Sequence, residues 1–209
     1  MTNYNSQSIQ EFNAALASEN PTPGGGTACA VALSNAMSLT AMVCSITLGR
    51  QKWESGWPAA EKGLECSSFD SIQWAMSAAT KDALAFDAVM DAYRLPKVDE
   101  EKILDRKIAI QDATRGAAEV PLQVAKRALS VMQTLPDLAI SGNGNAVTDI
   151  AVAALLADSA CKGAIFNVRI NISSLSTDDV TLFQSELEGL SELSTTLLTE
   201  ILHNVELRL

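Results

Sequence analysis

The chain has 209 residues, of which 47% are hydrophobic and 19% are charged, and its formal net charge is −10. This acidic balance argues against a nucleic-acid partner, because a phosphate backbone demands a basic footprint. The four cysteines, at positions 29, 44, 66 and 161, lack zinc-type spacing, and the N-terminus shows no signal-peptide pattern. We therefore expect reduced cysteines in a soluble cytoplasmic protein of one large domain or two small ones.

The first predicted helices surround a glycine turn. Ile9, Phe12 and Leu16 predict a short amphipathic helix that stops at Asn20-Pro21. The turn Pro21-Thr22-Pro23-Gly24-Gly25-Gly26 then leads into residues 27–48, which contain no charged residue. This segment is long enough to span a membrane. Its serines and threonines, and the lack of an aromatic belt at both ends, favour a central helix of a soluble bundle without a membrane partner.

The remaining segments also predict helices. They cover residues 59–93, 100–135 with a kink at Pro121, 148–169, and a last helix that starts at 178. A connector with Arg50, Lys52 and Trp53 follows the uncharged segment, and a second glycine turn lies at 141–145. No segment alternates with period two over a useful length. We predict an all-α protein with about six or seven helices in a single-domain bundle over residues 1–209.

Acid–base chemistry would rest on groups other than histidine. His203 is the only histidine, so a triad or metal site that needs several histidines is excluded within one chain, and we predict no metal. On helix 59–93, one apolar stripe consists of Ala79, Ala83, Phe86, Met90 and Tyr93. Asp82 falls about 60° from the centre of that stripe, whereas Asp87 and Asp91 lie further out. Desolvation there raises a carboxyl pKa. Asp82 is therefore either a general acid or base, or a capping or salt-bridged aspartate between helices.

Three other features allow two interpretations each. The glycine turn either exposes N–H groups to an anionic ligand or only makes a tight entry into a buried helix. Asn167 and Asn171 share one helix face, and their amides either satisfy a neighbouring backbone or bind a heterocycle. Asp149 follows the second glycine turn and either complements a helix N-terminus or belongs to a site.

These motifs together resemble a known family. The segments that carry the resemblance occur in the family's order: 21–27, 48–53, 82–97, 110–111 with 120–122, 142–149 and 167–171. They are similar to the cyclodeaminase/cyclohydrolase family of folate one-carbon metabolism, in its stand-alone form. The likeness extends over nearly the whole chain. Trp53 stands where the family is expected to have Tyr or Phe, so an aromatic residue is retained.

The resemblance implies an all-helical homodimer that binds a folate near the subunit contacts and needs no metal or redox cofactor. It implies that Asp82 is the catalytic carboxylate, with Lys97 as a second catalytic residue. The substrate-binding positions that it implies are Gly24, Gly25, Gly26, Arg50, Lys52, Asn143, Asp149, Asn167 and Asn171. The substrate is a tetrahydrofolate derivative, polyglutamylated or not, whose anionic tail would meet Arg50, Lys52, Lys97 or Arg169.

The resemblance leaves two reactions open. We expect a methenyltetrahydrofolate cyclohydrolase, because the chain resembles the stand-alone form. The alternative is a formimidoyltetrahydrofolate cyclodeaminase that releases ammonia. An alternative of another class is a non-catalytic helical protein that kept the folate pocket, but the presence of both Asp82 and Lys97 argues against it.

Overall fold

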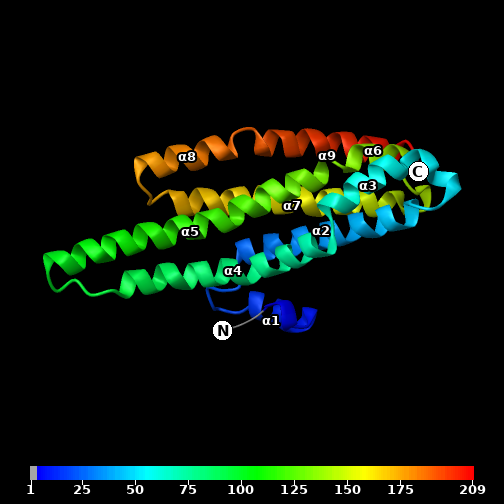
Figure 1. Ribbon diagram of the computed structural model, residues 1–209. Helices are drawn as coiled ribbons and strands as arrows, with labels where there is room; N and C mark the ends of the chain where they lie inside the picture. The colour runs from blue at the N-terminus through cyan, green and yellow to red at the C-terminus, as the bar shows by residue number, and fades with distance from the viewer. Residues whose placement is uncertain (1–3) are drawn as a thin grey trace.

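The structure, a computed structural model, describes residues 4–209, and its regular elements in that range are all helical (Figure 1). In chain order they are η1 (Tyr4–Ser6), α1 (Ile9–Leu16), α2 (Gly25–Thr47), η2 (Gln51–Gly56), α3 (Trp57–Cys66), α4 (Phe69–Arg94), α5 (Glu100–Met132), α6 (Leu135–Ser141), η3 (Gly144–Ala146), α7 (Val147–Ile172), α8 (Thr177–Leu187) and α9 (Leu190–Glu206). The prediction of an all-α single-domain bundle is confirmed.

The chain is divided more finely than the sequence pattern suggests. The helix expected over 59–93 is broken into α3 and α4, because Ser68 caps a new helix and its hydroxyl accepts from the Ser71 N–H at 3.2 Å. The last expected helix is broken into α8 and α9 at Gly189, whose φ of 74° is left-handed. Serine and glycine therefore set these boundaries where apolar periodicity continues across them.

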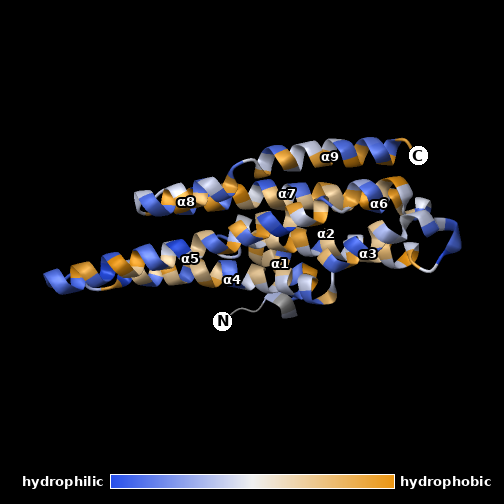
Figure 2. Ribbon diagram, turned by 45° about the horizontal axis from the view of Figure 1, so that its top comes forward, coloured by the Kyte–Doolittle hydropathy of each residue, from blue (hydrophilic) through white to orange (hydrophobic). Residues whose placement is uncertain are grey.

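The bundle is built around α2, α4, α5 and α7, which pack against one another in that cyclic order. Small side chains line the contacts, among them the fully buried Ala30, Ala78, Ala125 and Ala160. Alanine lets helix backbones approach closely, so the four helices pack through close backbone contact and not through large side chains. In Figure 2 the hydrophobic residues gather along α2 and α7. In the N-terminal part of α5, hydrophobic and hydrophilic residues alternate.

By length and composition alone, helix α2 is long and apolar enough to cross a membrane. It is also a core helix, since many of its residues, among them Ala30, Leu33 and Met37, are buried within the bundle. Core helices of soluble proteins meet the same criteria of length and composition, so this feature does not by itself indicate a membrane.

Helices α4 and α5 form a hairpin that projects beyond the other helices (Figure 1). Its tip carries exposed apolar residues, including Val98, Leu104 and Ile108. The glycine turn before α2 lies at the root of this hairpin, beside α4 and the C-terminal part of α7. The fold thereby brings three distant segments of the sequence to one end of the core.

Candidate active site

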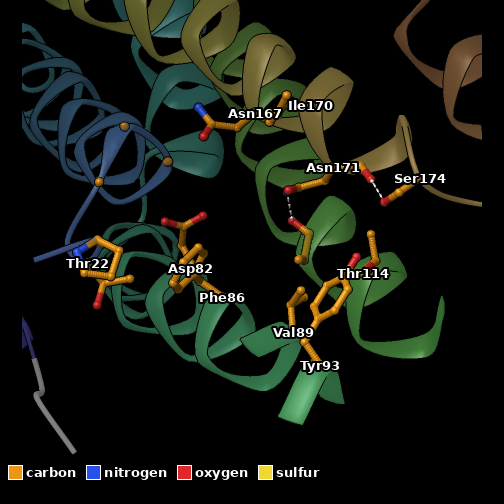
Figure 3. A pocket seen from close by; sticks show the side chains of 15 residues that line it. Thr22, Asp82, Phe86, Val89, Tyr93, Thr114, Asn167, Ile170, Asn171 and Ser174 are labelled. Carbon is orange, nitrogen blue, oxygen red and sulfur yellow. Dashed lines mark hydrogen bonds between the residues drawn. The ribbon is translucent and has the colours of Figure 1, made fainter. Parts of the chain in front are cut away.

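A pocket of about 270 Å³ opens at the root of the hairpin (Figure 3). Segments far apart in the sequence line it: Pro21, Thr22 and Gly24–Gly26 from the turn; Asp82, Phe86, Val89 and Tyr93 from α4; Thr114 and Ala117 from α5; and Asn167, Ile170, Asn171 and Ser174 from α7 and the loop after it. Among the described residues that line it, one is a carboxylate and none is a lysine or arginine. The pocket suits a neutral or cationic group better than an anionic one.

Asp82 closes the N-terminus of α2. The cap residue Gly24 has no side chain to accept from the first N–H groups of this helix. Asp82 supplies the acceptor from α4: its Oδ2 accepts from the Thr27 hydroxyl at 2.9 Å, and the Thr27 backbone N–H also reaches the carboxylate. Burial nevertheless raises the pKa of Asp82, although both hydrogen bonds from Thr27 act to lower it. Asp82 is thus a helix-capping group and a half-buried pocket carboxylate at once.

Gly26 is required by this contact. A Cβ atom at Gly26 would overlap the carboxylate of Asp82, whereas one at Gly25 would meet only the Asn167 amide at 3.7 Å. The tight-entry interpretation therefore holds for Gly26, which allows α4 to approach the helix start. Gly25 is exposed and lines the pocket, but the negative charge that a helix start favours is already supplied by the Asp82 carboxylate.

The two asparagines of α7 both line the pocket, and both amides bond to backbone. Asn167 Nδ2 donates to the Gly163 carbonyl at 2.9 Å, and Asn171 Nδ2 donates across to the Ala117 carbonyl of α5 at 2.7 Å. For Asn171, the expectation that it satisfies a neighbouring helix is therefore met. Its position at the pocket wall leaves the second interpretation, contact with a heterocycle, open as well.

Sequence patterns gave no site role to three further residues. Thr114 and Ser174 line the pocket, and Gln111 holds the loop that carries Ser174. Gln111 Nε2 donates to the Ser174 carbonyl at 2.9 Å, and its Oε1 accepts from the Ser176 N–H at 3.0 Å. Gln111 lies within one of the motifs of the resemblance, which was the only signal that could have drawn attention to it.

Within one chain, the other predicted site residues lie away from this pocket. Lys97 is in the exposed loop between α4 and α5 and does not line it. Arg50, Lys52, Asn143 and Asp149 lie at the other end of α2, and the 22 residue steps from Gly25 to Thr47 put that end roughly 33 Å away. A single chain therefore holds two separate groups of predicted site residues.

The second group has its own packing at the far end of α2. The Asn143 N–H donates to the Thr47 hydroxyl and its Nδ2 to the Ile46 carbonyl, both at 3.0 Å. Lys52 Nζ lies 4.6 Å from the centre of the Trp53 ring. Asp149 is in the first turn of α7, the helix-terminal position expected from its sequence context. Asn143 thus fastens the second glycine turn to α2.

Metal-ligating residues do not cluster in residues 4–209, where no group of three His, Cys, Asp or Glu side chains could hold an ion. The four cysteines, all within this range, are free. Burial raises the pKa of Cys29 to about 11 and that of Cys44 to about 12, so both are neutral thiols at pH 7. They behave as the packing residues that the sequence predicted.

Comparison with known proteins bears on this geometry. The Formiminotransferase-cyclodeaminase family model matches residues 8–187. The chain belongs to this family. It is 35% identical over 188 residues to a methenyltetrahydrofolate cyclohydrolase of Methylorubrum extorquens, with 88% of each chain covered. It is 32% identical over 173 residues to the formimidoyltransferase-cyclodeaminase of Mus musculus, where the match covers 83% of this chain and 32% of that protein.

A solved structure shares the fold of this family member. The formiminotetrahydrofolate cyclodeaminase of Thermotoga maritima superimposes with a TM-score of 0.83 at 28% identity, and 97% of each chain is covered. The resemblance to folate-acting enzymes is therefore confirmed by sequence and by structure.

Proposed function

We propose that this chain hydrolyses 5,10-methenyltetrahydrofolate to 10-formyltetrahydrofolate in the Asp82 pocket. The observation that carries the proposal is a half-buried carboxylate in a pocket that no lysine or arginine of residues 4–209 lines. The bridging carbon of the substrate lies between two nitrogens that share a positive charge, which a carboxylate attracts. The cyclohydrolase of Methylorubrum extorquens, which matches over 88% of both chains, supports this reaction over the alternatives.

In this reaction Asp82 accepts a proton from water while the water oxygen bonds to the bridging carbon. The bond from that carbon to N5 then breaks as N5 takes the proton from Asp82. The hydroxyl oxygen forms the formyl C=O, and its proton is released to solvent. A raised pKa makes the carboxylate a better base at a pH where it is still ionised. Asp82 lines the pocket while the Thr27 hydroxyl holds its Oδ2, so the carboxylate is fixed in place where the water would react.

The second candidate is cyclodeamination, which the likeness to the Thermotoga maritima enzyme favours. There N10 of 5-formimidoyltetrahydrofolate attacks the formimidoyl carbon, ammonia leaves, and the methenyl compound forms. The same carboxylate would transfer the protons. Both reactions pass through a tetrahedral carbon next to Asp82, so the pocket serves either.

Absorbance of methenyltetrahydrofolate separates the candidates. We expect purified protein to consume methenyltetrahydrofolate faster than buffer does, and to do so equally well after dialysis against a chelator. Production of the methenyl compound and of ammonia from formimidoyltetrahydrofolate, without its consumption, would assign the deaminase reaction instead. Binding without either conversion would indicate a non-catalytic folate-binding protein.

We also propose a soluble, cytoplasmic two-fold dimer formed on the outer faces of α2 and α7. The outer face of α7 is apolar, with Val152, Leu155 and Phe166 exposed by 46%, 47% and 67%. The neighbouring α2 has no charged residue. A two-fold axis across the middle of α2 would bring the Arg50 end of one copy to the Asp82 pocket of the other. That arrangement would supply the cations for a folate glutamate tail that the pocket of one chain lacks.

Light scattering at micromolar concentration tests the dimer. We expect twice the chain mass of 22.2 kDa, and the chain mass alone for Leu155→Glu. The control Ile103→Glu, at an exposed apolar position on α5, should stay dimeric. A wild-type protein with the mass of one chain would contradict the proposal.

Shared sites have a second test. If each site uses residues of both copies, a mixture of Asp82→Asn chains with Arg50→Ala/Lys52→Ala chains should be more active on polyglutamylated substrate than the two variants measured separately. Activity equal to the sum of the separate variants would show that each site is built from one chain.

A further inference from the structure

The kink residue of α5 leaves a carbonyl without its helical partner. Pro121 has no backbone N–H, so the carbonyl of Ala117, four residues earlier, cannot form its normal helical hydrogen bond. Both residues are buried, and an unpaired buried carbonyl is costly. The side-chain Nδ2 of Asn171, on the neighbouring α7, donates to this carbonyl at 2.7 Å. Pro121 thus leaves the Ala117 carbonyl free to accept the hydrogen bond from Asn171.

This contact fixes which way the Asn171 amide faces. A carbonyl oxygen can only accept, so the atom turned toward Ala117 must be the nitrogen. The oxygen, Oδ1, accepts no hydrogen bond from the part of the chain that the structure describes. Because Asn171 lines the pocket, a ligand meets an acceptor there.

Asn167, one turn earlier on α7, is oriented in the same way. Its Nδ2 donates to the Gly163 carbonyl at 2.9 Å, which leaves its Oδ1 for a ligand. The Oδ1 atoms of Asn167 and Asn171 and the carboxylate of Asp82 are then three oxygen acceptors that line this pocket. Tetrahydropterin carries matching donors: the 2-amino group, N3–H and N8–H.

We propose that Asn167 and Asn171 read the donor groups of the pterin through their Oδ1 atoms, and that Pro121 is the positioning residue that holds Asn171 in this orientation. This proposal rests on the proposed function, since it assigns the pterin to the Asp82 pocket. Pro121 touches no substrate. It acts by removing the N–H that would otherwise compete with Asn171 for the Ala117 carbonyl.

Pro121→Ala tests the positioning role. The variant regains an N–H at position 121, which bonds to the Ala117 carbonyl and releases the Asn171 amide to rotate. We expect KM for methenyltetrahydrofolate to rise about 3- to 10-fold, the value of one hydrogen bond, with kcat changed by less than about threefold. The midpoint of unfolding should be equal or higher, because proline no longer interrupts the helix. A purely structural role for Pro121 would leave KM unchanged, and that result would overturn the proposal.

Ligand specificity tests the acceptor role. The probe is the 2-desamino-2-methyl analogue of the substrate, which lacks the 2-amino donors. We expect the wild type to prefer the parent compound over this analogue, and Asn171→Ala and Pro121→Ala to have a smaller preference. An unchanged preference in both variants would show that Asn171 does not read these donors.

A stability cycle keeps the test independent of the reaction. Asn171→Ala should lower the unfolding midpoint in the wild-type background, because the Ala117 carbonyl loses its donor. In the Pro121→Ala background the same substitution should have little effect, because the new N–H at 121 serves that carbonyl. Equal losses in both backgrounds would refute the link between Pro121 and Asn171. If the wild type neither converts nor binds a folate, the proposed function fails. The stability cycle still shows whether Pro121 and Asn171 are linked.

Discussion

Replacing Asp82 by asparagine should lower turnover by about two to four orders of magnitude, the usual contribution of a positioned acid–base group. Asparagine keeps the shape and still offers an oxygen to the Thr27 hydroxyl, so the cap on α2 survives. The variant loses the charge that attracts the cationic substrate and the group that accepts a proton from water. Steady-state kinetics on methenyltetrahydrofolate and on formimidoyltetrahydrofolate measures the loss.

The pH dependence follows from the raised pKa of Asp82. The base must be ionised, so kcat/KM of the wild type should fall as the pH drops through a value above the ordinary aspartate pKa of about 3.9. This acid limb should be absent from the residual activity of Asp82→Asn.

The stability of the protein should depend on pH in the opposite direction. The contribution of a group with a raised pKa to the free energy of unfolding is present below about pH 3.9 and is lost as the pH rises through its folded-state pKa. At pH 7 the asparagine variant should therefore be no less stable than the wild type.

Asp87→Asn and Asp91→Asn are the matched controls on the same helix. Both side chains are exposed, and Asp91 pairs with Arg94 at 2.7 Å on the surface. We expect both variants to keep turnover within a few-fold of the wild type. A folded Asp82→Asn protein with the wild-type rate in both reactions would remove Asp82 from the mechanism.

Gly26→Ala should lower turnover about 100-fold, because the added Cβ displaces the carboxylate that reacts. The displacement also strains the contact between α2 and α4, and we expect a loss of about 1–3 kcal/mol in the free energy of unfolding. Denaturant unfolding and steady-state kinetics measure the two effects separately.

Gly116→Ala is the control for replacing a helical glycine. It lies in α5, and a Cβ there meets no atom within 4 Å. Alanine favours a helix interior over glycine by roughly 0.5–1 kcal/mol, so this variant should be more stable and equally active. A Gly26→Ala protein with wild-type turnover would show that the close approach of Asp82 to the helix start is dispensable.

Apolar periodicity was sufficient to predict the class of fold, but not every boundary. The absence of charge in residues 27–48 located α2, since a helix without charge is stable only when it is largely covered. Ala79 and Ala83, the first two residues of the apolar stripe on α4, are buried. Phe86, Met90 and Tyr93 of the same stripe are 37%, 38% and 47% exposed, because α4 continues past the core into the projecting hairpin. Periodicity shows which residues share one face of a helix, but it cannot show where the helices packed against that face end.

The site was predictable in part for a similar reason. The sequence placed Asp82 beside an apolar stripe, which is a property of one helix. That the same carboxylate caps α2 depends on how α2 meets α4, which no local pattern contains. The link between Pro121 and Asn171 likewise depends on a hydrogen bond between residues 54 positions apart, Ala117 and Asn171, so the kink was visible in the sequence but its partner was not. The roles of Lys97, Arg50, Lys52, Asn143 and Asp149 stay predictions that depend on a second copy of the chain.

A crystal structure of the Asp82→Asn protein with bound methenyltetrahydrofolate tests the central claim most directly. We predict that the pterin lies between α4 and α7, that the bridging carbon is within about 4 Å of the residue 82 side chain, and that the Oδ1 atoms of Asn167 and Asn171 face pterin N–H groups. A folate bound only at the far end of α2, beside Trp53 and Asn143 and away from residue 82 of either copy, would contradict the account.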